Sequence, residues 1–67
     1  MNGEIGFAAG EVYRFLETSG PAPHGQIQKA TGYNDALVNQ ALGWLAREDN
    51  VTAEKEGRVT LWRLTLR

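Results

Sequence analysis

The chain has 67 residues and no cysteine, and its seven Lys and Arg against eight Asp and Glu give a formal net charge of −1. The lack of thiols excludes disulfide frameworks and thiolate metal sites, and it favours a reducing, cytoplasmic compartment. An apolar content of 42% is too high for a disordered segment, and no apolar run approaches the roughly 20 residues that cross a bilayer. We therefore expect one domain spanning residues 1–67, without a membrane partner.

The first predicted element is a helix from Glu4 to Thr18, in which apolar residues recur at three- and four-residue steps. Its inward face is expected to comprise Ile5, Ala8, Ala9, Val12, Phe15 and Leu16. Gly20 and Pro21 should end this helix. The connector at residues 19–25 holds two prolines and two glycines, so at most it forms a short edge strand.

A second helix is predicted from about His24 to Thr31, with Ile27 and Ala30 facing inward and Gly32 as a left-handed cap. His24, which directly follows Pro23, is expected to face solvent or to cap this helix.

A third helix is predicted to begin at Asn34 as its N-cap and to run to about Glu48. Its apolar arc comprises Leu37, Val38, Ala41, Leu42 and Leu45, with Trp44 at the edge. The opposite arc comprises Ala36, Asn39, Gln40, Gly43, Ala46 and Arg47. We expect Trp44 and Trp62 to be the two largest side chains of the core.

From Val51 onward the apolar period changes to two, which predicts strands at residues 51–54 and 59–66. A turn centred on residues 56–57 pairs Val51 with Trp62 and Ala53 with Thr60. The face expected to pack on the helices carries Val51, Ala53, Trp62, Leu64 and Leu66. The outer face carries Thr52, Glu54, Val59, Leu61 and Arg63.

Three helices, a tight turn at residues 32–34 and a terminal hairpin resemble the winged helix-turn-helix superfamily. The resemblance rests on GQIQKATGYNDALVNQALGWLAREDNV, residues 25–51, where an apolar residue and an alanine precede a turn glycine and V-x-x-A-L-x-x-L follows. The trailing GRVTLWRLT, residues 57–65, is similar to the return strand of a wing. The resemblance implies an α+β winged helix-turn-helix fold, like that of small stand-alone bacterial and archaeal proteins of uncharacterised function.

In a helix-turn-helix the third helix enters the major groove of DNA. Asn39 and Gln40 carry amides that suit adenine, Arg47 suits guanine or phosphate, and Lys29 would anchor the backbone near the second helix. Gly43 would allow close approach. The alternative is that these polar side chains only solvate an exposed helix, and Asp35 at the helix start argues against phosphate contact.

At the hairpin tip, Lys55 and Arg58 are positioned for phosphate or minor-groove contact. The alternative is that they keep the tip soluble while the neighbouring glutamates neutralise them. Val59 and Leu61 on the outer face indicate contact with another protein or with a second copy of the chain, although single exposed aliphatic residues are common.

The sequence therefore predicts a transcription- or chromatin-associated protein that binds double-stranded DNA weakly or as a homodimer, because cations are few. The alternative is a protein-interaction module on the same scaffold without DNA affinity. We expect no enzyme, metal site, cofactor or small-molecule ligand, because His24 is the single imidazole and no carboxylate pair or phosphate loop accompanies it.

Overall fold

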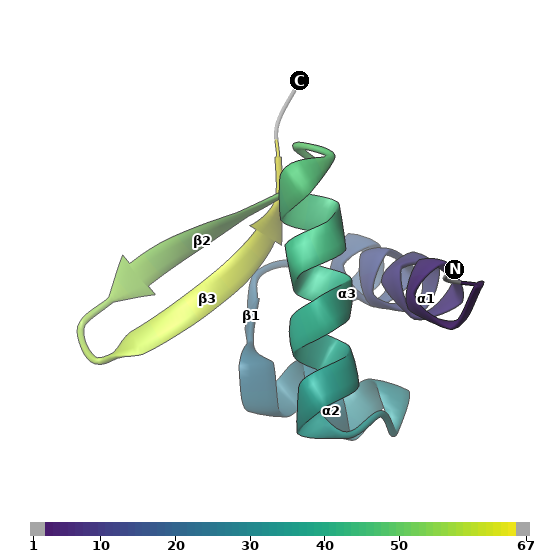
Figure 1. Cartoon of the computed structure of the whole chain (residues 1–67). Helices are drawn as coiled ribbons and strands as arrows, with labels where there is room; N and C mark the ends of the chain where they lie inside the picture. The colour runs from purple at the N-terminus through teal and green to yellow at the C-terminus, as the bar shows by residue number, and fades with distance from the viewer. Residues whose placement is uncertain (1–2, 66–67) are drawn as a thin grey trace.

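The computed structural model describes residues 3–65 as three helices and a three-stranded antiparallel sheet (Figure 1). The elements are α1 (Gly3–Ser19), β1 (Ala22–Pro23), α2 (His24–Thr31), α3 (Asp35–Arg47), β2 (Val51–Glu56) and β3 (Val59–Leu64). This order confirms the predicted α+β winged helix-turn-helix class. The helix bounds lie within one or two residues of the prediction. The connector after the first helix forms the short edge strand β1.

The turn between α2 and α3 is fixed by a cap at each end. Gly32 ends α2 with a left-handed φ of +79°, and its N–H donates to the Gln28 carbonyl at 2.9 Å. Asn34 starts α3, and its side-chain oxygen accepts from the Leu37 N–H at 2.8 Å. Both predicted caps are confirmed, and they define the three-residue turn of a helix-turn-helix.

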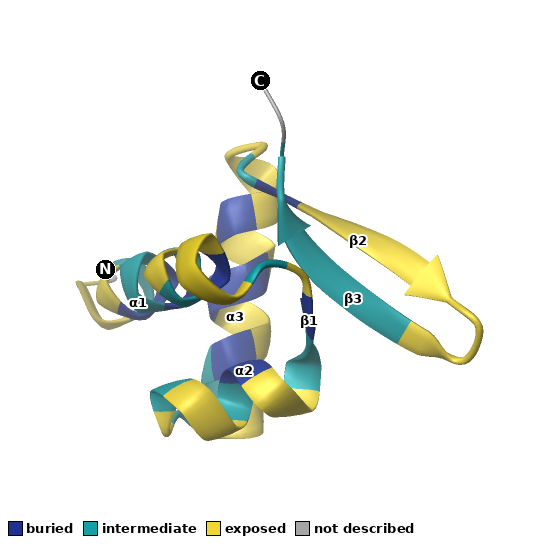
Figure 2. Ribbon diagram, turned by 180° about the vertical axis from the view of Figure 1, so that it is seen from behind, coloured by how far each residue is buried: buried dark blue, intermediate teal, exposed yellow. Residues whose placement is uncertain are grey.

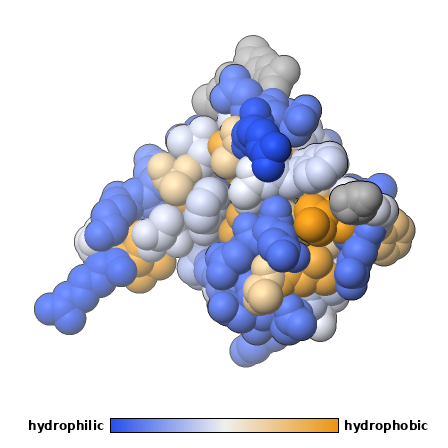
Figure 3. Space-filling view, viewed as in Figure 1, coloured by the Kyte–Doolittle hydropathy of each residue, from blue (hydrophilic) through white to orange (hydrophobic). Residues whose placement is uncertain are grey.

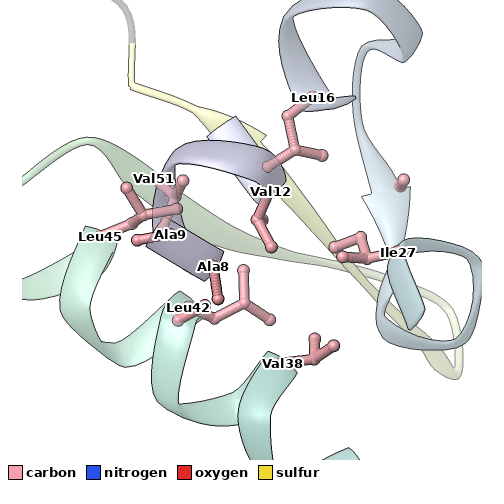
Figure 4. Packing of buried hydrophobic residues seen from close by; sticks show 11 residues of the cluster. Ala8, Ala9, Val12, Leu16, Ile27, Val38, Leu42, Leu45 and Val51 are labelled. Atoms are coloured by element: carbon pink, nitrogen blue, oxygen red, sulfur yellow. The ribbon is translucent and has the colours of Figure 1, made fainter. Parts of the chain in front are cut away.

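The core lies where the three helices meet the base of the sheet. Figure 4 shows Ala8, Val12 and Leu42 at its centre, which brings α1 against α3. Its buried members are Ala8, Ala9, Val12, Leu16, Ala22, Ile27, Val38, Ala41, Leu42, Leu45 and Val51. The small alanine side chains on both helices allow their backbones to pack closely.

Some residues predicted to be in the core are exposed, and others are half-buried against it. Trp44 is 40% exposed, Ala30 is exposed and Trp62 is only half-buried. Phe15 and Leu37, like Trp62, are half-buried and pack against the core, and Ile5 is also half-buried. The prediction of two core tryptophans is wrong for Trp44, because so small a core covers only a narrow stripe of each helix. Trp44 lies beside the buried residues of α3 but is itself exposed.

The sheet has the strand order β1, β3, β2, so β3 is central. Ala22 lies opposite Trp62, and Pro23 lies opposite Leu61. Pro23 has no N–H to donate, and an edge strand of two residues is where a sheet accepts a proline. This short strand ties the connector between α1 and α2 to the middle of β3.

The hairpin register differs by two residues from the prediction. Ala53 lies opposite Trp62 rather than Thr60, because the two-residue turn falls at residues 57–58 instead of 56–57. Gly57 has a φ of +64°, and the tight hairpin turns require positive φ at their first central residue. Both strands reach the turn, so β2 extends to Glu56 rather than ending at Glu54.

A shift of two residues leaves each side chain on its predicted face, because side chains alternate along a strand. The two predicted faces are confirmed, while Leu66 lies outside the described residues. On the inner face, Val51 is buried and Trp62 and Leu64 pack against the core, whereas residues 52–56 of β2 are exposed. Figures 1 and 2 show the reason, since the hairpin projects away from the helices as a wing.

Within residues 3–65, no helix has the length and apolar character that a membrane span requires.

Candidate nucleic-acid interface

The outward side of α3 is polar and uncovered. Seen from behind, Figure 2 shows the buried stripe of α3 turned toward α1, which leaves the opposite side open in the view of Figure 1. All members of the predicted outward arc are exposed: Ala36, Asn39, Gln40, Gly43, Ala46 and Arg47. Their exposure is confirmed, and their contact with DNA stays a prediction.

Gly43 lies in the middle of this exposed arc. A Cβ added there would meet no atom within 4 Å among the described residues, and its φ is not positive. A glycine inside a helix costs about 1 kcal/mol relative to alanine. Neither packing nor backbone conformation within the chain therefore requires a glycine at this position.

The cations divide into a paired and an unpaired set. Arg14 donates to Glu11 at 3.1 Å on α1, and Arg63 donates to Glu54 at 3.3 Å across the hairpin. The described cations with no carboxylate partner within 4 Å are Lys29, Arg47, Lys55 and Arg58. These four are the cations that the sequence assigned to nucleic acid, and unpaired groups keep all their donors for phosphate.

The wing carries two of these unpaired cations at its end. Lys55 lies opposite Thr60, and Arg58 occupies the second position of the turn. Figure 3 shows hydrophilic side chains extending from the end of the hairpin. Glu54, which was expected to neutralise this tip, is bonded to Arg63 instead.

The apolar pair predicted on the outer face of the wing is only partly open. Val59 is 47% exposed, but Leu61 is half-buried, opposite Glu54. Phe7 on α1 and Trp44 on α3 are the other large exposed hydrophobic residues in the described part of the chain. Figure 3 shows hydrophobic surface both on the wing and between α3 and α1.

His24 and Asp35 form a contact that the sequence analysis missed. His24 is the first residue of α2 and Asp35 is the first residue of α3, and His24 Nε2 lies 2.7 Å from Asp35 Oδ1. The His24 side chain therefore reaches the next helix rather than solvent or its own helix end. No local pattern in the sequence signals this contact, because the angle between α2 and α3 brings the two residues together.

No group of three His, Asp or Glu side chains in the described ranges is arranged to hold a metal ion. A surface depression of about 390 Å³ runs along α2 and is lined by Gly25, Gln28, Lys29, Gly32 and Tyr33. Only Lys29 in this lining is charged, so the depression brings together no catalytic set.

Three comparisons relate the chain to known proteins. The chain is 43% identical over 61 residues to the uncharacterized protein MJ1608 of Methanocaldococcus jannaschii, covering 87% of this chain and 86% of that protein. Its structure is similar to a Zalpha domain of Carassius auratus PKZ, solved in complex with Z-DNA. The TM-score is 0.80 at 24% identity, over 91% of this chain and 97% of the Zalpha chain. This second likeness concerns the fold. A family model also matches residues 1–64, and the chain belongs to the winged helix-turn-helix domain family DUF2582.

Proposed function

We propose that this protein binds double-stranded DNA through α3 and the wing, in a transcription-associated role. The observation that carries the proposal is the division of the cations. Arg14 and Arg63 are satisfied by glutamates, whereas the four unpaired cations lie on the helix-turn-helix and the wing. Unpaired cations on a winged helix are suited to phosphate contact.

In this proposal α3 reads the bases. The amides of Asn39 and Gln40 would donate to and accept from adenine in the major groove, and Arg47 would bind guanine or phosphate. All three side chains are exposed on the uncovered side of α3. Gly43 lies among them and would let the helix backbone come close to the duplex.

Lys29 on α2, with Lys55 and Arg58 on the wing, would hold the DNA backbone on either side of α3. With the four unpaired cations of residues 3–65, the logarithm of affinity should fall against the logarithm of salt with a slope of about −3 to −4. Affinity of a single copy is then modest, and a homodimer would supply specificity by joining two half-sites.

The Zalpha domain was solved with Z-DNA, which makes the form of the duplex a variable to test. Affinity should be measured for a mixed-sequence right-handed duplex and for a left-handed duplex, between about 50 and 200 mM salt. Binding that is unchanged across this salt range would contradict a phosphate-driven interface, whichever duplex is used.

The residue-level test compares two variants with equal change in net charge. Lys55→Gln with Arg58→Gln removes two positive charges from the wing, and Arg14→Glu lowers the charge by the same amount on α1. The slope of the wing variant should be smaller in magnitude by about two, because each phosphate contact contributes about 0.9. The Arg14 variant should keep the slope, and equal effects of the two variants would overturn the wing contact.

A second candidate function is a protein-interaction module whose contact is the outer face of the wing. The exposure of Val59, at 47%, favours it, with Leu61 beside it on the same face. Val59→Ser, which adds no charge beside Arg58, should then weaken self-association in analytical ultracentrifugation. A wild-type chain that stays monomeric at high concentration would exclude a second copy as the partner.

A further inference from the structure

The starts of α2 and α3 are joined by one ion pair. His24 Nε2 and Asp35 Oδ1 are 2.7 Å apart, and the side chains are 28% and 71% exposed. Because Asp35 remains largely exposed, its charge is felt outside the protein as well as by His24. The net charge of the pair is zero when the imidazole is protonated and −1 when it is neutral.

Asp35 lies where the proposed interface would be most sensitive to a negative charge. It is the first residue of α3, and Asn39 follows it by four residues, on the same side of the helix one turn later. The amino end of a recognition helix is the part that contacts the bases. An uncompensated carboxylate there would repel the phosphates that flank the groove.

His24 has no other ionic partner in the described structure. The elements packed against α2 are α1, α3, β1 and β3, and β1 has no ionisable side chain. Their charged residues, with the one cation of α2 itself, are Glu4, Glu11, Arg14, Glu17, Lys29, Asp35, Arg47 and Arg63. Among these, only Asp35 forms an ion pair with His24.

We propose that His24 controls the net charge at the start of α3 through its contact with Asp35, so that duplex affinity depends on pH through this one imidazole. The inference rests on the proposed DNA-binding function. Protonated His24 offsets Asp35, and the interface then meets phosphate without a net negative charge at this end. Loss of the proton leaves Asp35 uncompensated. Binding therefore favours the protonated form, and affinity falls when the imidazole loses its proton.

The test is duplex affinity at constant low salt from about pH 5.5 to 8, the range in which an imidazole changes charge. Because the chain has a single histidine, His24→Gln removes every imidazole while keeping a side chain that can bond Asp35. The wild type should bind about three- to tenfold more tightly at the acidic end, as one charge near a surface would produce. His24→Gln should bind throughout as the wild type does at the alkaline end.

Asp35→Asn gives an independent arm. At the alkaline end, His24 and the amide introduced at position 35 are both neutral, so the duplex affinity of this variant should match that of the wild type at the acidic end. The affinity should still depend on pH, because His24 remains. Thermal unfolding of both variants establishes that each is folded at both pH values. A change in folding alone would not produce this ordering of affinities.

The outcomes separate the two proposals. A wild-type chain that binds the duplex equally at both pH values, or a His24→Gln variant that keeps the wild-type pH profile, overturns the role of His24 and leaves DNA binding intact. A wild-type chain that binds neither duplex form at any pH overturns the proposed function, and this inference with it.

Discussion

The side-chain oxygen of Asn34 accepts a hydrogen bond from the Leu37 N–H at 2.8 Å, and this bond satisfies a donor that the first turn of α3 leaves open. Asn34→Ala should lower the free energy of unfolding by about 1 kcal/mol, because the N-cap is lost. Asn34→Asp keeps an acceptor and serves as the control. Urea denaturation measures both, and an alanine variant as stable as the wild type would remove the cap from the account of this turn.

Gly43→Ala should change stability and DNA affinity in opposite directions. The added methyl meets no atom of the described chain, so helix propensity should raise the free energy of unfolding by up to about 1 kcal/mol. The same methyl should weaken duplex binding by about 1 kcal/mol or more, since it crowds a close contact.

Gly10→Ala on α1 is the matched control, because a Cβ there also meets nothing within 4 Å. It should stabilise the fold to a similar degree and leave duplex affinity unchanged. If Gly43→Ala also leaves affinity unchanged, the DNA backbone does not approach α3 at this residue.

Arg47→Ala should reduce the salt slope of duplex binding by about one, because one phosphate or base contact is lost. Arg14→Ala removes a cation that is bonded to Glu11, so its slope should stay at the wild-type value. Titrations at several salt concentrations measure both slopes. The reverse ordering would mean that the open side of α3 is not the DNA-binding side.

Leu42→Ala should destabilise the fold by about 2–5 kcal/mol, since the side chain is 1% exposed at the centre of the core. A small domain has little more stability than this to lose, so the variant should be largely unfolded at room temperature. Leu37→Ala, on the half-buried edge of the same helix, should cost clearly less. Denaturation curves that rank the two variants equally would contradict the position of the core.

The helices and their ends were predictable because the signals are local. Periodic apolar residues define the buried side of α3, and Gly32 and Asn34 are the residue types that end and start helices. The two faces of the wing were predictable for a similar reason, since alternation fixes the face of each side chain. The register was not, because turns at residues 56–57 and 57–58 both contain Gly57 and preserve the alternation.

The depth of burial and the contacts across the turn depend on tertiary packing. Trp44 has the side chain of a core residue, but its exposure follows from how little of α3 the other elements cover. The contact of His24 with Asp35 joins residues 11 apart, and only the angle between α2 and α3 brings them together. The sequence positions of Lys29, Arg47, Lys55 and Arg58 suggest nucleic-acid contact. Only the structure shows that Arg14 and Arg63, in contrast, are each paired with a glutamate.

The most direct measurement is a low-salt titration of isotope-labelled protein with a mixed-sequence duplex, followed residue by residue in an amide NMR spectrum. DNA binding through α3 and the wing predicts that shifts concentrate at Asn39, Gln40, Arg47, Lys55 and Arg58, and that residues on the outer side of α1 stay unchanged. Shifts confined to α1, or no shifts where even non-specific phosphate attraction should be visible, would contradict DNA binding by this surface.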